Sequence, residues 1–150
     1  MPAPGTSKGH QVISKAFPLL SIVVLQFPMV VFMFASPPLL ILKHDTPVDG
    51  RFIRNLFNID YIVVMTFAAV GAAGCALMGK DSLALAMGGL VVFVVGVRSL
   101  VIANMDRLRD AIAHGDSMAV SRFRRLHIAG MILNVVQFGT VAWGLTRLAM

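Results

Sequence analysis

Charged residues are scarce in this chain. Of its 150 residues, 13% are charged and 57% are hydrophobic, whereas soluble domains carry about 25% charged residues. The mean hydropathy is +0.82. A soluble protein of this composition would have to expose a largely apolar surface, which is disfavoured. The scarcity of charge therefore excludes an ordinary soluble domain and indicates an integral membrane protein.

Cysteine and the common catalytic motifs are lacking as well. Cys75 is the only cysteine, which excludes an intrachain disulfide and a multi-cysteine metal site. The sequence has no Walker, G-x-S-x-G or H-E-x-x-H pattern and no acidic cluster suited to a divalent cation. We therefore assign no catalytic residue and predict no metal and no cofactor.

Basic residues outnumber acidic ones, but not in the pattern of a nucleic-acid-binding protein. The chain has 13 Lys and Arg residues against 7 acidic ones, a net charge of +6. The basic residues lie mainly between apolar blocks, and no basic run is interleaved with aromatics. Such residues set membrane topology and meet anionic headgroups. We predict a bilayer with anionic headgroups as the partner, and no nucleic acid.

Four apolar segments are long enough to span the hydrocarbon core, which takes about 20 mostly apolar residues. They run over about 17–42, 59–78, 83–105 and 127–149. The first is longer than the apolar part of a signal peptide, and we expect it to be retained. The predicted fold is an all-α four-helix transmembrane bundle over 17–150, preceded by a flexible tail over 1–16.

Turn residues punctuate the connections. Gly79 suits the left-handed end of the second helix, and Asp81 or Ser82 suits the N-cap of the third. Thr46 suits an N-cap and is followed by a proline. This pattern predicts the start of a short helix that leads into the second span. A Gly-Asp break at 115–116 predicts a helical hairpin, basic in character, between the third and fourth spans.

The distribution of Lys and Arg predicts the orientation. The side with the two long connections carries eight: Lys43, Arg51, Arg54, Arg107, Arg109, Arg122, Arg124 and Arg125. The opposite side carries four: Lys8, Lys15, Lys80 and Arg147. The positive-inside rule then places the long connections, including the hairpin, in the cytoplasm and both termini outside. We expect the seven arginines of the first group to bind headgroups.

Five polar residues within or beside the spans are candidate core or ligand contacts: Arg98, Asp60, His127, Asn134 and Gln137. Arg98 would bind an anionic headgroup, quinone or substrate, or else snorkel or pair with Asp60. His127 would make an interfacial hydrogen bond or ligate haem, although no second histidine stands in a span to join it. Asn134 and Gln137 share a helical face with His127 and would bond across helices or line a transport path.

One resemblance covers most of the chain after about residue 25. It rests on an arginine-rich extension, a Gly-Asp break, F-x-x-L-H, a following L-N, and R-F-x-x-x-L-F before the second span. The residues are Arg107, Arg109, Gly115, Asp116, Phe123, Leu126, His127, Leu133 and Asn134, with Arg51, Phe52, Leu56 and Phe57. The chain resembles a family of small bacterial four-helix membrane proteins of unknown function, similar to eukaryotic small transmembrane proteins. A more distant similarity is to copper-resistance-D-like membrane proteins, whose histidines within spans this chain lacks.

These features predict a non-enzymatic structural or accessory subunit that packs against a larger membrane complex or against itself. Two alternatives stay open. One is a haem-associated or redox membrane enzyme that uses His127 and Arg98, so enzymatic activity is left undecided. The other is a small transporter with Arg98, Asn134 and Gln137 along its path.

Overall fold

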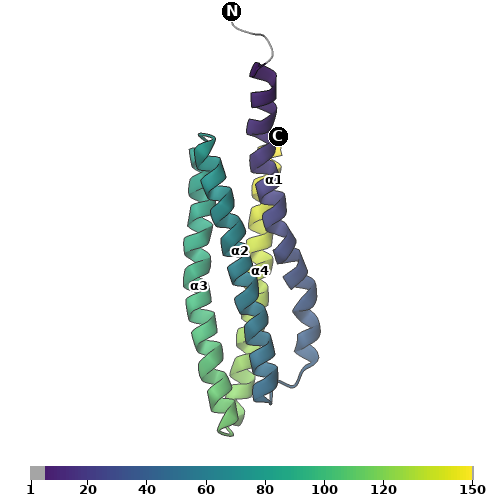
Figure 1. Ribbon diagram of the computed structural model, residues 1–150. Coiled ribbons are helices and arrows are strands. Elements are labelled where there is room, and N and C mark those ends of the chain that lie inside the picture. The colour runs from purple at the N-terminus through teal and green to yellow at the C-terminus, as the bar shows by residue number, and fades with distance from the viewer. Residues whose placement is uncertain (1–5, 150) are drawn as a thin grey trace, which may run out of the picture.

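Four long helices and one short 3-10 helix make up the computed structural model. It describes residues 6–149, with side chains described at 16, 17, 19–144 and 146, and this part contains no strand. The elements are α1 Thr6–Ala35, η1 Pro37–Ile41, α2 Pro47–Leu77, α3 Asp81–Ala113 and α4 Ser117–Ala149 (Figure 1). The predicted all-α four-helix bundle is confirmed. All four helices are long and apolar enough to cross a membrane, as expected of an integral membrane protein.

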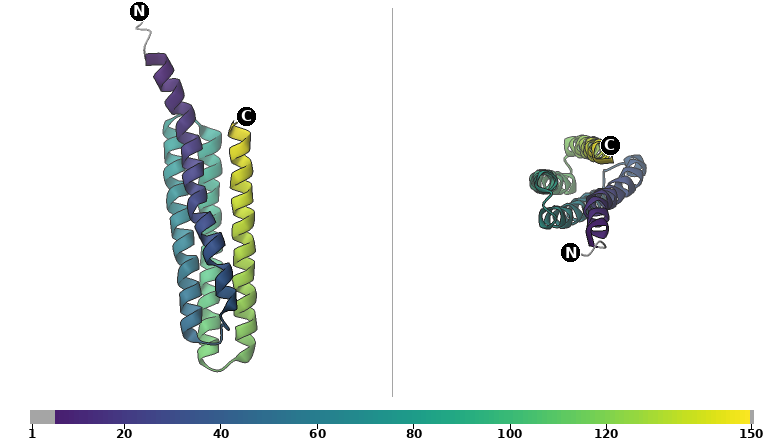
Figure 2. Two further views of the ribbon diagram at one scale, coloured as in Figure 1. Left: turned by 90° about the vertical axis from the view of Figure 1, so that its right-hand side faces the viewer. Right: turned by 90° about the horizontal axis from the view of Figure 1, so that it is seen from above.

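The helices run alternately up and down. The connections from α1 to α2 and from α3 to α4 lie at one end of the bundle, and the tight turn between α2 and α3 lies at the other (Figure 1). Viewed along the bundle axis, the helices form a ring in the order α1, α2, α3, α4. Each helix packs mainly on its two neighbours in this ring, so α4 packs on α1 (Figure 2). Both long connections therefore share one end, which we call the loop end.

The turns follow from local chemistry. The Thr46 side chain accepts a hydrogen bond from the backbone N–H of Asp49 at 3.2 Å, which caps α2. Gly79 and Gly115 have φ of +68° and +86°, a conformation that glycine adopts without steric cost. Asp116 accepts from the N–H of Met118 at 2.8 Å and opens α4. The predicted N-cap of α3 was wrong, because Lys80 occupies that position and Asp81 begins the helix.

Two boundaries differ from the sequence prediction. Helix α1 begins at Thr6, so it runs through most of the segment predicted as a tail, of which 1–5 lie outside the described residues. Proline disfavours a helix interior, but the prolines of that segment come before Thr6. The stretch after them can therefore be helical. The second span and its predicted leading helix form one uninterrupted helix from Pro47.

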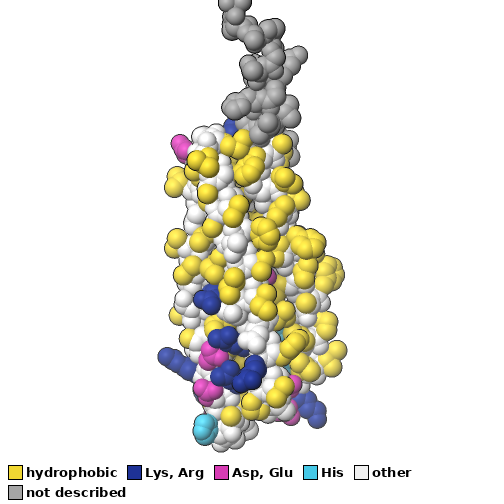
Figure 3. Space-filling view, in the orientation of Figure 1, with side chains coloured by type: hydrophobic (Ala, Val, Ile, Leu, Met, Phe, Trp, Pro, Cys, Tyr) yellow, Lys and Arg dark blue, Asp and Glu magenta, His cyan; other side chains and the backbone are white. Residues whose placement is uncertain are grey.

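The bundle is thin, and most of its apolar surface faces outward. Between 17% and 33% of the most apolar stretch of each span is buried. Hydrophobic side chains cover the middle and the far end, while most of the charged ones gather toward the loop end (Figure 3). A bilayer would cover such an apolar belt, and the long connections would lie at one of its surfaces.

Candidate functional site

Three buried polar side chains meet near the loop end and form what we call the histidine cluster: Ser36, His44 and His127. His127 Nε2 lies 3.0 Å from Ser36 Oγ, and its Nδ1 lies 3.1 Å from His44 Nε2. His44 Nδ1 is also bonded to the carbonyl oxygen of Leu42. All three side chains have no exposed surface.

The Leu42 carbonyl determines where the protons of the histidine cluster lie. A carbonyl oxygen only accepts, so His44 Nδ1 must carry the hydrogen. With neutral rings, His44 Nε2 is then an acceptor, which His127 Nδ1 satisfies by donating to it. That leaves His127 Nε2 to accept from the Ser36 hydroxyl. Every donor and acceptor on the two rings is therefore matched without any charge.

An unusual backbone conformation brings His44 into the cluster. Its φ is +63°, and among the described residues it is the one non-glycine with positive φ. This conformation costs of order 1 kcal/mol and needs surrounding contacts to hold it. The ring of Phe57 provides another contact, 5.5 Å from the His127 ring and nearly perpendicular to it. The hydrogen bonds and the packing together outweigh the strain.

No second histidine stands in a span, as expected, but His44 from the connection lies beside His127. His44 lies in a connection rather than a span, and only the reversal of the chain after η1 carries it back to α4. Sequence spacing gave no signal for this contact. Both His127 nitrogens are engaged, so a bond from this ring to a haem iron would require the loss of one hydrogen bond. The residues described contain no group of three or more potential metal-ligating side chains.

A second group of buried polar residues lies inside the bundle and is called here the polar layer: Gln26, Asp60, Tyr61, Asn134 and Gln137. Asn134 Nδ2 donates to Asp60 Oδ2 at 3.2 Å, joining α4 to α2. Asp60, Asn134 and Gln137, three of the candidate core or ligand contacts, are 7%, 2% and 7% exposed.

The polar layer leaves many atoms unmatched. Five buried side-chain atoms have no hydrogen-bond partner in the described part of the chain: Gln26 Nε2, Asp60 Oδ1, Tyr61 OH, Asn134 Oδ1 and Gln137 Nε2. Asp60 is about 25 Å along α2 from Leu77, the last residue of that helix at the tight-turn end. A hydrocarbon core is about 30 Å thick, so a core that begins at Leu77 would include Asp60. An ionisable residue inside a span is a candidate functional site.

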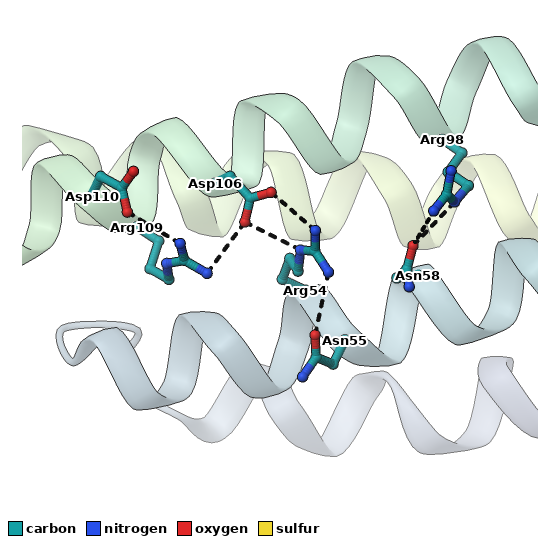
Figure 4. A network of polar contacts seen from close by, with 7 residues as sticks. All are labelled: Arg54, Asn55, Asn58, Arg98, Asp106, Arg109 and Asp110. Atoms are coloured by element: carbon teal, nitrogen blue, oxygen red, sulfur yellow. Dashed lines mark hydrogen bonds and ion pairs between the residues drawn. The ribbon is translucent and has the colours of Figure 1, made fainter.

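Arg98 does not pair with Asp60. Its Nε and Nη2 donate to Asn58 Oδ1 at 3.0 and 2.8 Å, across α2 and α3 (Figure 4). Residues two apart on a helix point to opposite sides, so Asn58 faces α3 while Asp60 faces α4. Arg98 is partly exposed and about 25 Å from the start of α3, a depth from which its guanidinium can snorkel toward the headgroups.

Two of the predicted headgroup arginines are engaged within the protein instead. Arg54 and Arg109 form ion pairs with Asp106 at 3.1 and 3.3 Å, and Arg109 also contacts Asp110 at 3.2 Å (Figure 4). The Arg54–Asp106 bond links α2 to α3. These groups are about a quarter to two thirds exposed, so each pair stabilises the protein by at most about 1 kcal/mol.

Three other arginines converge on one crevice between α3 and α4. Arg107, Arg122 and Arg125 line it with Leu126 and other residues, and its volume is about 520 Å³. All three arginine side chains are exposed. We call this the arginine crevice. Arg124, by contrast, donates to the carbonyl oxygen of Leu40 at 3.5 Å.

Comparison with known proteins identifies no family for this chain. No protein-family model matches it, and neither the curated proteins nor the solved structures include one similar to it. The resemblance to small four-helix membrane proteins therefore stays a prediction. What the chain does must be argued from its own geometry.

Proposed function

We propose that this protein is an integral membrane subunit that associates laterally, through the outward face of α3, with a second copy of itself. The main support is a row of small, exposed residues, seven positions apart, on that face: Ser82, Gly89, Gly96 and Ala103. Small residues at helical spacing allow two helices to approach closely in lipid, where packing replaces the hydrophobic effect.

The surroundings of this row support the proposal. Helix α3 is the least buried of the four, with 17% of its most apolar stretch covered. A Cβ atom added at Gly89 or Gly96 would meet nothing within 4 Å inside the chain. The protein's own packing therefore does not require glycine at either position. Large exposed side chains flank the row on both sides, among them Val92 and Phe93.

The test replaces Gly89 and Gly96 by leucine and measures oligomeric state by native mass spectrometry and by energy transfer between labelled copies in nanodiscs. We expect the natural chain to self-associate and the double variant to be monomeric. Gly139→Leu on α4 is the matched control, because a Cβ there also meets nothing within 4 Å. Association that survives in the double variant, or a natural chain that is monomeric, contradicts the proposal. Capture of the natural chain by a different membrane subunit would favour an accessory role in a larger complex.

We also propose that the arginine crevice holds a phosphate group of an anionic lipid. Basic crevices between helices near a membrane surface suit such headgroups, and Arg107, Arg122 and Arg125 lie on one crevice. Changing all three to glutamine should lower the amount of anionic phospholipid that stays bound on mild purification, by several-fold. Lys80→Gln, at the tight-turn end, should leave it unchanged. Equal lipid retention in the triple variant would contradict the proposal.

The haem and transport hypotheses receive less support. Haem ligation by His127 has to break the hydrogen bond to Ser36 or to His44. An absorption spectrum of the gently purified protein, compared with that of His127→Ala, tests it directly. Of the three residues expected along a transport path, Asn134 and Gln137 are buried. Arg98 is hydrogen-bonded to Asn58 between α2 and α3.

A further inference from the structure

An apolar groove of about 360 Å³ lies between α1 and α2. Three phenylalanines line it, Phe27 and Phe32 from α1 and Phe67 from α2, and Asp60 is the one ionisable residue among its lining. Phe27 and Val31, also in the lining, are 72% and 51% exposed on the outer surface. The groove is therefore accessible sideways from the lipid, and its volume suits a small organic molecule.

Asp60 lines this apolar groove and carries one unused acceptor oxygen. Its Oδ2 accepts from Asn134, while Oδ1 is buried and has no partner among the described residues. The ion pairs of the described region use Asp106 and Asp110 instead. A buried carboxyl oxygen without a hydrogen-bond partner is costly. Asp60 Oδ1 therefore lacks the donor that its buried environment calls for.

No nearby arginine supplies the missing partner. Arg54, on the same helix as Asp60, is paired with Asp106. Arg98 is bound to Asn58 on the side of α2 that faces α3. The phenyl rings of the groove add a preference of their own, because aromatic faces attract ammonium groups. Asp60 is about 5 Å along α2 from Phe57, whose ring lies beside the histidine cluster near the loop end.

We propose that this groove binds a lipophilic ammonium cation, that is, an apolar body carrying a protonated amine. The N–H group would donate to Asp60 Oδ1, and the apolar body would lie along the phenylalanines toward the bilayer centre. This site is independent of the association through α3, because the groove belongs to α1 and α2. The proposal assigns a binding site and its ligand class and does not require a reaction.

The experiment uses 4-phenylbutylammonium as the probe, titrated into the full chain in nanodiscs of zwitterionic lipid, with empty nanodiscs as the blank. The uncharged 4-phenylbutanol is the matched ligand. We expect the ammonium compound to bind at least tenfold more tightly than the alcohol. Asp60→Asn should weaken ammonium binding at least tenfold and leave alcohol binding nearly unchanged. Asp45→Asn, which removes an exposed carboxylate outside the groove, should change neither.

Asp60→Asn is expected to fold, since an asparagine oxygen can still accept from Asn134 Nδ2. If it does not, Val31→Trp tests the proposal separately by filling the groove from its exposed side while leaving Asp60 in place. Ammonium binding should then be lost. Equal affinity for the two probes, full binding in Asp60→Asn, or full binding in Val31→Trp would each overturn the proposal. None of these results bears on the oligomeric state measured with Gly89→Leu and Gly96→Leu.

Discussion

The histidine cluster and the polar layer are both buried and polar, yet their hydrogen bonding differs. In the histidine cluster, each ring nitrogen has a partner, and neutral rings satisfy the whole arrangement. In the polar layer, one bond between Asn134 and Asp60 is accompanied by five unmatched atoms. Buried polar groups in native proteins are normally matched, and an exception calls for an explanation.

The difference indicates different roles. A fully matched buried group rigidifies its surroundings, and the histidine cluster ties η1 and the following connection to α4. An incompletely matched group stabilises the fold poorly and is retained for another reason, such as a ligand. Phe57 separates the two, with its ring 5.5 Å from that of His127 and 6.1 Å from that of Tyr61. Mutations on either side of Phe57 should therefore have opposite effects on stability.

The largest effect is expected at the centre of the histidine cluster. His127→Ala should lower the free energy of unfolding by about 3 kcal/mol, because it leaves Ser36 and His44 unmatched and opens a cavity. This loss of stability can be measured by steric trapping of the unfolded protein in mild detergent. His127→Gln, whose amide can still reach Ser36, should recover part of the loss. A loss below about 1 kcal/mol would mean that the cluster does not hold the fold.

The next effect is expected at Gly130, which packs against the ring that separates the two groups. A Cβ there would lie 2.3 Å from Phe57 Cε1, and Phe57 is fully buried. Gly130→Ala should cost about 2 kcal/mol of unfolding free energy through overpacking. Gly139→Ala on the same helix meets nothing within 4 Å and should cost nothing. Equal stabilities of the two variants would show that Phe57 is free to move.

Replacing the hydrogen-bonded pair of the polar layer, Asp60 and Asn134, should increase stability instead of lowering it. The double variant Asp60→Leu/Asn134→Leu should raise the unfolding free energy by about 1 kcal/mol, since it replaces poorly matched polar groups by apolar ones. Asp60→Leu alone should be less stable than the double variant, because it leaves Asn134 Nδ2 without its acceptor. Destabilisation by the double variant would show that the polar layer supports the fold as the histidine cluster does.

The smallest changes in stability are expected from two variants that each remove a single hydroxyl group. Ser36→Ala should lower the unfolding free energy by about 1 kcal/mol, because His127 Nε2 loses its donor. Tyr61→Phe removes a buried hydroxyl that has no partner and should leave stability unchanged or slightly higher. Both variants can be measured in the same detergent. Equal losses would mean that the Tyr61 hydroxyl is matched in solution and that the two groups are alike.

Much of the architecture could be predicted from the sequence because it depends on local rules. The four helices follow from four long apolar stretches, and the turns at Gly79 and Gly115 follow from glycine's access to positive φ. The inward face of α4 follows from helical periodicity, which aligns His127 with Asn134. These features need no knowledge of which helices are neighbours.

The partners of the polar side chains were decided by the tertiary structure. Pairing of Arg98 with Asp60 was one of the alternatives left open by the sequence, but in the structure Asn58 faces α3 and Asp60 faces α4. His44 gave no signal because its contact with His127 joins residues 83 apart through a strained loop conformation. Composition and periodicity determined that this chain forms four apolar helices. Only their packing decided which polar atoms of the described residues are matched and which are left without a partner, because a hydrogen bond depends on distance and direction in space.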